Sequence, residues 1–327
     1  MKKNKFSFSK GFLISIIFFS FFKCVYSLAL YLYNLSISRS DKTFLTKYID
    51  LTDKEKELMD EDKNNKAINY WKEHTPSKLY NILSYDNKLL YGKVYVQENF
   101  SNKTAILVHG YCGSGDVMNY AAKRFYEKGF NVVLPDCRGH GHSEGSYIGM
   151  GWHDRKDVLM WCEKIIKANK DAEIVLYGVS MGAATVMMVS GETLPPNIKC
   201  IVEDCGYTSV YDEFKYQLKN MYRFIPTFPI LDIVGMLCNF RAGYSFRKAS
   251  ALKQIKKCKV PVLFIHGGND KFVPTEMVYK LFENANCKKD ILIIENAGHG
   301  VAAMIDNKKY WGRVFEFINE NLNSQAN

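Results

Sequence analysis

A serine between two glycines is the strongest chemical signal in this chain of 327 residues. The segment 178–182 reads Gly-Val-Ser-Met-Gly, follows an apolar run at 173–177 and opens a stretch of small and apolar residues. A G-x-S-x-G motif between a strand and a helix holds its serine on a tight turn, where bulkier neighbours would collide with the strand and helix. The pattern therefore predicts that Ser180 presents its hydroxyl as a nucleophile.

A serine hydroxyl needs a base to take its proton, and that base needs a group that orients it. Two residues late in the chain suit these roles. Asp270 follows the apolar run at 260–265, and His299 follows the apolar run at 291–294. If both runs are parallel strands, the two side chains lie at the sheet edge that also carries Ser180. We expect His299 to act as the base and Asp270 to orient it.

An oxyanion hole requires two backbone N–H groups aimed at the charge that develops on the substrate. The N–H of Met181, directly after the nucleophile, is one candidate. The loop 109–113, which contains two glycines, supplies the other, and we expect Tyr111 to be its donor. Asp204 also follows a predicted strand and is the alternative to Asp270 as the acid.

Apolar runs that alternate with amphipathic segments must position these residues. Strands without polar alternation, separated by helices, indicate a mostly parallel sheet covered on both faces. The first two strands have no helix between them, and we expect them to pair antiparallel around a turn at Asn87. Strands are predicted at 78–84, 88–97, 104–109, 131–134, 173–177, 200–202, 260–265 and 291–294, and helices at 119–128, 154–170 and 180–190.

One aromatic-rich stretch, at about 207–250, interrupts this alternation. It has the length of two or more helices and is inserted after the strand at 200–202. Because of its position, we interpret it as a cap over the catalytic site. Surface helices with one buried face are the alternative interpretation.

The segment 11–35 is almost wholly apolar and long enough to span a bilayer as a helix. Lys23 near its middle opposes insertion by about 2.5–3.5 kcal/mol, which the surrounding apolar residues offset. Four lysines lie within residues 1–10, so the positive-inside rule places that end in the cytoplasm and the domain 78–327 outside. We predict an uncleaved signal-anchor that crosses the cell membrane once, with a cleaved signal peptide as the alternative. The segment 36–77 reads as a helical spacer.

Composition narrows the range of partners. The net charge is +10, but it is spread along the chain without the dense basic tract of a nucleic-acid-binding protein, so we expect no nucleic acid. The nine cysteines form no C-x-x-C pair and no Cys/His spacing that suits zinc, and no metal is predicted. Phosphate-binding and dinucleotide motifs are also absent from the sequence, so no cofactor is implied.

Several motifs together resemble the α/β-hydrolase superfamily, over about residues 78–322. They are a His-Gly pair at 109–110, the segment 136–143 (Asp-Cys-Arg-Gly-His-Gly-His-Ser), the serine turn, the Asp270 segment, and a Gly-His-Gly sequence at 298–300. The chain looks most like bacterial membrane-associated hydrolases of the serine-aminopeptidase and monoglyceride-lipase-like branch. The resemblance implies that fold and a triad of serine, aspartate and histidine.

These observations predict a membrane-anchored serine hydrolase that cleaves carboxylic esters, and amides less readily, through an acyl-enzyme on Ser180. The aromatic cap favours an apolar acyl or aryl group, in a small-molecule or lipid ester. An acyltransferase that uses the same three residues is one alternative. A non-catalytic binding protein on the same fold is another, which the complete triad argues against.

Overall fold

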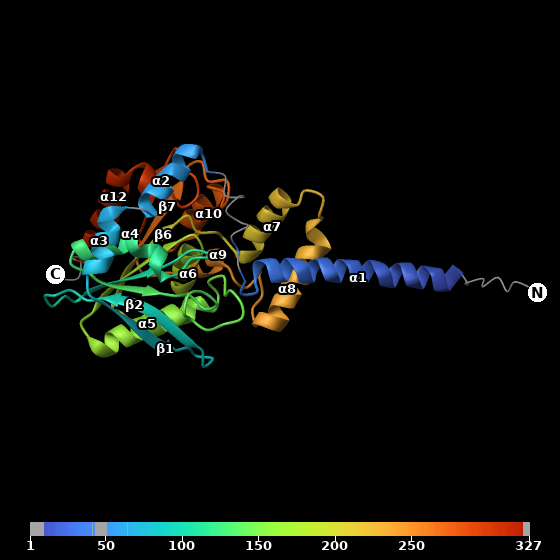
Figure 1. The fold of residues 1–327 in the computed structure, drawn as a ribbon, viewed down its shortest axis with the longest axis horizontal. Helices are drawn as coiled ribbons and strands as arrows, with labels where there is room; N and C mark the ends of the chain where they lie inside the picture. Colours follow the sequence, from blue (N-terminus) through green and yellow to red (C-terminus); the bar gives the residue numbers. More distant parts are fainter. Residues whose placement is uncertain (1–9, 41, 43–50, 64, 323–327) are drawn as a thin grey trace, which may run out of the picture.

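An eight-stranded sheet forms the centre of the molecule (Figure 1). The computed structural model describes residues 10–40, 42, 51–63 and 65–322, so nearly all of the predicted cytoplasmic segment 1–10 lies outside the described residues. The strands are β1 (Ser77–Leu83), β2 (Leu89–Tyr95), β3 (Lys103–Val108), β4 (Asn131–Pro135), β5 (Glu173–Val179), β6 (Ile198–Asp204), β7 (Val262–Gly267) and β8 (Lys289–Ile294). Their order in the sheet is β1-β2-β4-β3-β5-β6-β7-β8.

The sheet is antiparallel at one edge and parallel elsewhere. β2 pairs antiparallel with both β1 and β4, and every other neighbouring pair is parallel. The β1–β2 hairpin turns at Asn87, which has a φ of 59°, a left-handed conformation that asparagine tolerates well. The predicted α/β-hydrolase fold with a mostly parallel sheet is therefore confirmed, and so is the antiparallel first pair.

Helices cover both faces of the sheet. They include α2 (Asp53–Lys63), α3 (Lys66–His74), the short 3-10 helix η2 (Gly115–Met118), α4 (Asn119–Glu127), α5 (Asp154–Ala168), α6 (Met181–Val189), α9 (Ala251–Ile255), α10 (Glu276–Asn284), α11 (Ala302–Ile305) and α12 (Asn307–Leu322). Successive side chains of a strand point to opposite faces. Accordingly, Ile106 and Val108 of β3 join the core under α5 and α6, whereas Ala105 and Leu107 join the core under α4 and α12.

The short helices η2, α9 and α11 lie outside the segments predicted as helices from the sequence, and so do the longer α10 and α12. The two longer helices are amphipathic. α12 buries Tyr310, Val314 and Phe317 against the sheet, and α10 buries Val278 and Leu281 on the opposite face. They complete the coverage of the β7–β8 side of the sheet, and α12 also carries a tyrosine that binds one of the two candidate catalytic acids.

The stretch between β6 and α9 forms α7 (Val210–Met221) and α8 (Thr227–Ala242). In Figure 1 both helices stand outside the layers of the sheet, beside the base of the long helix α1 (Lys10–Ser36). α1 packs on α8 through its C-terminal part, where Ala29 and Tyr33 are buried. The residues 11–24 of α1 are all exposed and project away from the domain.

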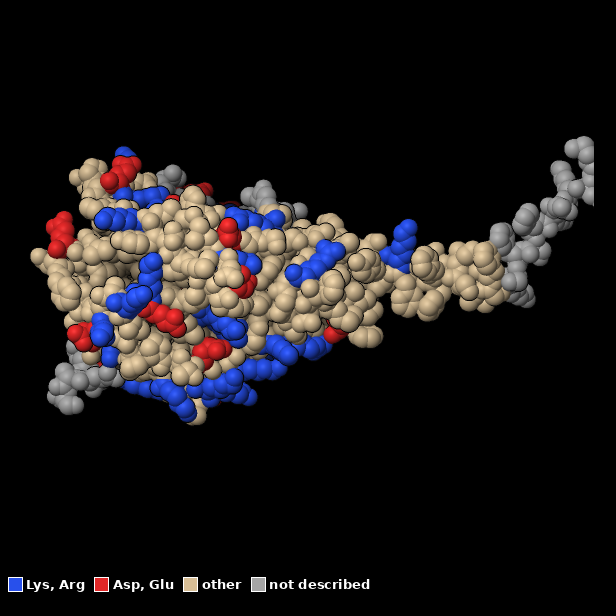
Figure 2. Space-filling model, turned by 90° about the horizontal axis from the view of Figure 1, so that it is seen from below, with Lys and Arg blue, Asp and Glu red and all other residues tan. Residues whose placement is uncertain are grey.

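α1 is, among the described residues, the one helix long and apolar enough to cross a membrane. A signal sequence at the start of a chain would have the same length and composition. Figure 2 shows the projecting part of α1 as a rod almost without charged side chains, whereas lysines and arginines gather on the body of the domain.

Candidate active site

Ser180 lies on the sharp turn between β5 and α6, with φ 57° and ψ −116°. A non-glycine residue rarely adopts a positive φ, and the surrounding structure must hold it there. The Ser180 N–H donates to the carbonyl of Asp204 at 2.8 Å. A Cβ at Gly182 would lie 2.0 Å from the carbonyl oxygen of Val108, and one at Gly178 would lie 2.3 Å from that of Gly182. The glycines are therefore required by direct contact with backbone.

The three residues predicted as a triad form a hydrogen-bonded chain with His299 in the middle. The Ser180 hydroxyl lies 2.9 Å from Nε2 of His299, and Nδ1 of His299 lies 2.7 Å from Oδ2 of Asp270. Oδ1 of Asp270 accepts the backbone N–H groups of Phe272 and Val273, both at 2.9 Å. The carboxylate is thus fixed on one side by its own loop and on the other by the imidazole.

The electrostatics of the pair suit a base and its orienting acid. Burial alone would raise the pKa of Asp270, but the charge and hydrogen bonds of His299 and His266 hold that pKa well below its usual range. Burial alone would lower the pKa of His299, yet the Asp270 carboxylate raises it above the ordinary histidine value. An ionised Asp270 in this position can stabilise an imidazolium at His299.

Asp204, the alternative acid, does not reach Nδ1 of His299. Its Oδ2 accepts the hydroxyl of Tyr310 from α12 at 2.7 Å, and burial raises the pKa of Asp204 to about 6. The same tyrosine hydroxyl is 2.7 Å from that of Tyr177 on β5. The geometry therefore favours Asp270 as the partner of His299 and gives Asp204 a structural bond to α12.

The two predicted oxyanion donors both lie beside Ser180. Met181 is the first residue of α6, where backbone N–H groups have no intrahelical acceptor and the helix dipole favours negative charge. Tyr111 follows Gly110, where an added Cβ would lie only 3.4 Å from Cβ of Ser180. Both residues line the cavity beside the serine. This arrangement can direct two N–H groups at one oxygen.

Other polar residues near the site shape its loops. The buried His109 accepts the N–H of Cys137 at 3.0 Å through Nε2 and bonds the carbonyl of Gly110 at 2.7 Å through Nδ1. Asp136 accepts the N–H groups of Gly115 and His142. The buried guanidinium of Arg138 forms ion pairs with Asp86 and Asp157, so it and Asp136 hold the 136–143 loop in place.

Glu55 contacts the loop of His299, and this contact was not predicted from the sequence. Its Oε2 accepts the N–H and hydroxyl of Thr52, and the Glu55 N–H in turn donates to the Thr52 hydroxyl, as in a capping box. Its other oxygen accepts the N–H of Gly298 at 2.6 Å. The Thr52–Glu55 spacing signals the cap, but nothing in the sequence signals the bond to the loop that carries His299.

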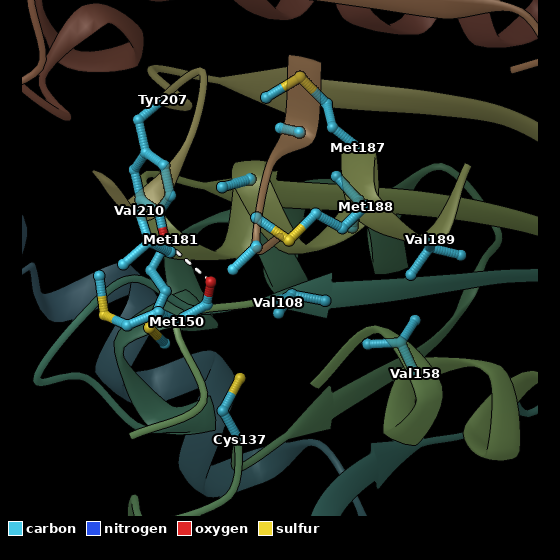
Figure 3. Packing of buried hydrophobic residues seen from close by; sticks show 14 of the residues in the cluster. Val108, Cys137, Met150, Val158, Met181, Met187, Met188, Val189, Tyr207 and Val210 are labelled. Atoms are coloured by element: carbon cyan, nitrogen blue, oxygen red, sulfur yellow. Dashed lines mark hydrogen bonds between the residues drawn. The ribbon is translucent and has the colours of Figure 1, made fainter. Parts of the chain in front are cut away.

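An apolar cavity opens beside Ser180. Met150, Tyr207 and Phe272 come from the loops of the hydrolase domain, and the hydroxyl of Tyr207 donates to the carbonyl of Met150 at 3.1 Å (Figure 3). The remaining walls come from α7, α8 and the end of α1. They include Phe214, Leu218, Met221, Leu231, Val234, Leu32 and Leu35.

Glu213 of α7 is the acidic exception in this lining. Its Oε1 accepts the side-chain amide of Gln217 at 2.8 Å, while its buried Oε2 has no hydrogen-bond partner among the described residues. Burial raises the pKa of Glu213 to about 8, against the effect of the Gln217 hydrogen bond. At neutral pH the group is therefore mostly a carboxylic acid that can donate as well as accept.

Only one group of described residues brings three metal-ligating atoms together near the site. These are Cys205, Asp270 and His299, whose ligand atoms all lie within 4.8 Å of one another. A metal there would have to displace the hydrogen bonds of His299 to Ser180 and Asp270. The arrangement is better suited to proton transfer than to ligation.

Known proteins resemble this chain in both sequence and fold. The family model for serine aminopeptidases, S33, matches residues 101–225. The esterase Pf2001 of Pyrococcus furiosus superposes with a TM-score of 0.62 at 23% identity, and the match covers 75% of this chain and 91% of the esterase. The chain is a member of the α/β-hydrolase superfamily.

Relatives of the hydrolase include proteins with and without an assigned activity. It is 30% identical over 207 residues to the uncharacterised protein YqkD of Bacillus subtilis, covering 62% of this chain and 66% of YqkD. It is 25% identical over 198 residues to the lysophosphatidylserine lipase ABHD12 of Danio rerio, covering 58% of this chain and 49% of the lipase. The hydrolase thus aligns with about two thirds of the first relative and half of the second.

Proposed function

We propose that this serine hydrolase is anchored to a membrane by α1 and cleaves carboxylic esters with an apolar acyl group. The observation that carries the proposal is the hydrogen-bonded chain from Ser180 through His299 to Asp270, at the mouth of an apolar cavity. The anchor is supported by the apolar, exposed first half of α1. An uncleaved anchor would keep the catalytic domain at the membrane surface, outside the cytoplasm.

The proposed reaction has two stages. Oγ of Ser180 attacks the carbonyl carbon while Nε2 of His299 accepts the hydroxyl proton. The N–H groups of Tyr111 and Met181 stabilise the oxyanion of the tetrahedral intermediate. The bond to the leaving alkoxide then breaks, and His299 returns the proton to it as the alcohol departs. Water, deprotonated by His299, then attacks the acyl carbon, the bond to Oγ of Ser180 breaks, and His299 returns the proton to Oγ as the carboxylic acid leaves.

The lining of the cavity supports an ester over a peptide substrate. Met, Leu and aromatic side chains dominate the walls, and they match an acyl chain through the hydrophobic effect. The acidic exception, Glu213, is mostly neutral at pH 7 and suits a hydroxyl of the alcohol moiety. The lipase among the relatives acts on a lipid, whereas the S33 family model is named for peptidases. Ester and peptide-like substrates should therefore be compared directly.

The test is hydrolysis of p-nitrophenyl esters of graded chain length, beside an aminoacyl-p-nitroanilide of similar size. The proposal predicts that kcat/KM rises from the acetyl to medium-chain esters and that the anilide is a much poorer substrate. Ser180→Ala is the matched control and should hydrolyse none of them. A preference for the anilide would instead support a peptidase, and release of product by the Ser180→Ala variant would refute the assigned nucleophile.

A further inference from the structure

The depth of α1 in a bilayer can be worked out from its length. Each helical residue advances the chain by about 1.5 Å, and a hydrocarbon core about 30 Å thick needs about 20 residues. The part of α1 that projects freely, residues 11–24, supplies about 21 Å of this. The remaining thickness must come from residues 25–30, which are already beside the domain and include the buried Ala29. A bilayer that α1 spans therefore also surrounds part of whatever packs on those residues.

The element that packs there is α8, and its surface suits such a position. Phe228, Met236 and Phe240 of α8 are 76%, 63% and 88% exposed, and Phe224 in the connection from α7 is fully exposed. Figure 1 shows this connection on the side of the domain from which α1 projects. Beyond its first residue, and apart from Asn239, Arg241 and Asp232, which is paired with Arg247, α8 is apolar on both its buried and its exposed faces. Such a composition is typical of a helix at a membrane.

Basic residues border the exposed aromatic side chains. Lys219 and Arg223 are exposed near the end of α7, and the guanidinium of Arg241 lies 5.4 Å from the ring of Tyr33 on α1. Apolar side chains flanked by lysine and arginine are the usual composition of a surface that enters the headgroup region of a lipid leaflet. This end of α1 therefore lies beside apolar side chains of α8 that suit lipid and beside the exposed Arg241, which suits headgroups.

The catalytic cavity begins where this membrane segment ends. Leu32, Leu35 and Ser36 of α1 line the cavity that contains Ser180. The carbonyl of Ser36 also accepts the hydroxyl of Tyr111 at 2.6 Å, so α1 touches the residue that supplies an oxyanion donor. These residues lie about 3–9 Å along the helix beyond residue 30, which is the depth of the headgroups.

We infer that α1 is a wall of the substrate pocket as well as an anchor, and that α1 and α8 seat the pocket in the lipid interface. The substrate is then a lipid ester of the surrounding leaflet, whose acyl chain enters the pocket without crossing water. Leu32 and Leu35 determine the chain length that fits. This inference rests on the proposed esterase function and extends it from soluble esters to lipids held in the bilayer.

The first experiment uses the full chain reconstituted in phosphatidylcholine–phosphatidylglycerol vesicles. Two substrates are compared, p-nitrophenyl acetate in water and a long-chain monoacylglycerol in the vesicles. Phe240→Asp should reduce turnover of the vesicle ester by about tenfold, since a charge on α8 opposes its seating in lipid, and leave acetate hydrolysis unchanged. Phe100→Asp is the control, because Phe100 is 85% exposed and precedes β3, at the sheet edge opposite Ser180.

The second experiment tests α1 as a pocket wall. Leu35→Trp and Leu32→Trp should lower the ratio of long-chain to acetyl kcat/KM by about tenfold, since the indole occupies space that the acyl chain needs. Tyr31→Trp is the control on the same helix, because its side chain faces away from the cavity and is 55% exposed. The control should leave the ratio unchanged.

The outcomes separate this inference from the function on which it rests. If the parent hydrolyses both esters but the two leucine variants keep its chain-length ratio, α1 is not a pocket wall and the inference is wrong. If Phe240→Asp and Phe100→Asp behave alike, or if Phe240→Asp instead dissociates a stable dimer, α8 does not face lipid. Hydrolysis of neither ester by the folded parent would refute the proposed function itself.

Discussion

Two regions of the molecule differ in which side chains they bury. One is the catalytic edge of the sheet, which carries Ser180, Asp270 and His299, and the other is the α1–α8 surface, formed by helices α1 and α8. At the catalytic edge, polar groups are buried and paired, as Asp270 is with His299, Phe272 and Val273. On the α1–α8 surface, large apolar groups such as Phe240 are exposed. The first pattern is what a protein needs to hold charge in a fixed geometry, and the second is what a soluble surface avoids. The two regions therefore suit different surroundings, a water-excluded polar site at the catalytic edge and, as proposed, lipid at the α1–α8 surface.

The largest effect is expected from replacing Asp270, the acid of the hydrogen-bonded chain that runs from Ser180 through His299. Asp270→Asn keeps the size of the side chain but removes the charge that stabilises imidazolium, so kcat should fall by about 10⁴-fold. Because Asp270 raises the pKa of His299, the acid limb of the kcat/KM profile should also move to lower pH in this variant. Residual activity measured from pH 5 to 9 checks both, and an unshifted limb would contradict the assigned pairing.

Asp204→Asn is the matched control for that variant. It removes the other buried carboxylate near His299, whose Oδ2 accepts the hydroxyl of Tyr310. We expect it to lower stability more than activity. A loss of kcat as large as that of Asp270→Asn would make Asp204 the working acid instead.

A smaller effect, on stability, is expected from Glu213, the buried acid of α7. The pKa of Glu213 is raised from 4.5 to about 8 in the folded chain, so the unfolded chain releases this proton first as pH rises. Linkage then lowers the free energy of unfolding progressively from about pH 4.5 to 8, by roughly 3 kcal/mol at pH 7. Glu213→Gln removes that dependence, and its advantage in Tm over the parent should grow from pH 5 to pH 8. An advantage independent of pH would show that Glu213 is ionised in the fold.

The smallest effect is expected from the hydrogen bond that joins Glu55, in the N-terminal segment, to the loop of His299. Glu55→Ala removes the acceptor for the N–H of Gly298, so the loop of His299 loosens and kcat should fall by about tenfold with little change in KM. Thr52→Ala removes only the helix cap and should lower Tm by a few degrees, as the loss of ~1 kcal/mol implies. Equal kcat in both variants would mean that the Gly298 bond is structurally redundant.

Much of the catalytic edge could be predicted because its signals are local in sequence. Glycines at 178 and 182 indicate a tight turn, where a Cβ would collide with backbone. The apolar runs before Asp270 and His299 indicate strands that end at the same edge of the sheet. The succession of strands and helices along the chain follows from the alternation of apolar and amphipathic segments, whereas the order of the strands within the sheet was not predicted. These parts of the fold need no long-range information beyond the rules of parallel sheets.

The contacts that could not be predicted join segments far apart in sequence. The bond from Glu55 to Gly298 spans 243 positions, and that from Tyr111 to Ser36 spans 75. Nothing in the residue types at these positions specifies a partner, because a glutamate can accept from any N–H group. The role of α1 in the pocket was hidden for the same reason, since an apolar segment of that length looks the same whether it only anchors or also lines a cavity.

Covalent labelling of the folded, full-length chain by a fluorophosphonate tests the central claim most directly. Such probes modify a serine only when a neighbouring base activates its hydroxyl. We expect stoichiometric labelling that mass spectrometry places on Ser180, strong loss of labelling in His299→Ala, and none in Ser180→Ala. An unlabelled parent, or a label on another serine, would contradict the assignment of Ser180, His299 and Asp270 as the reacting group.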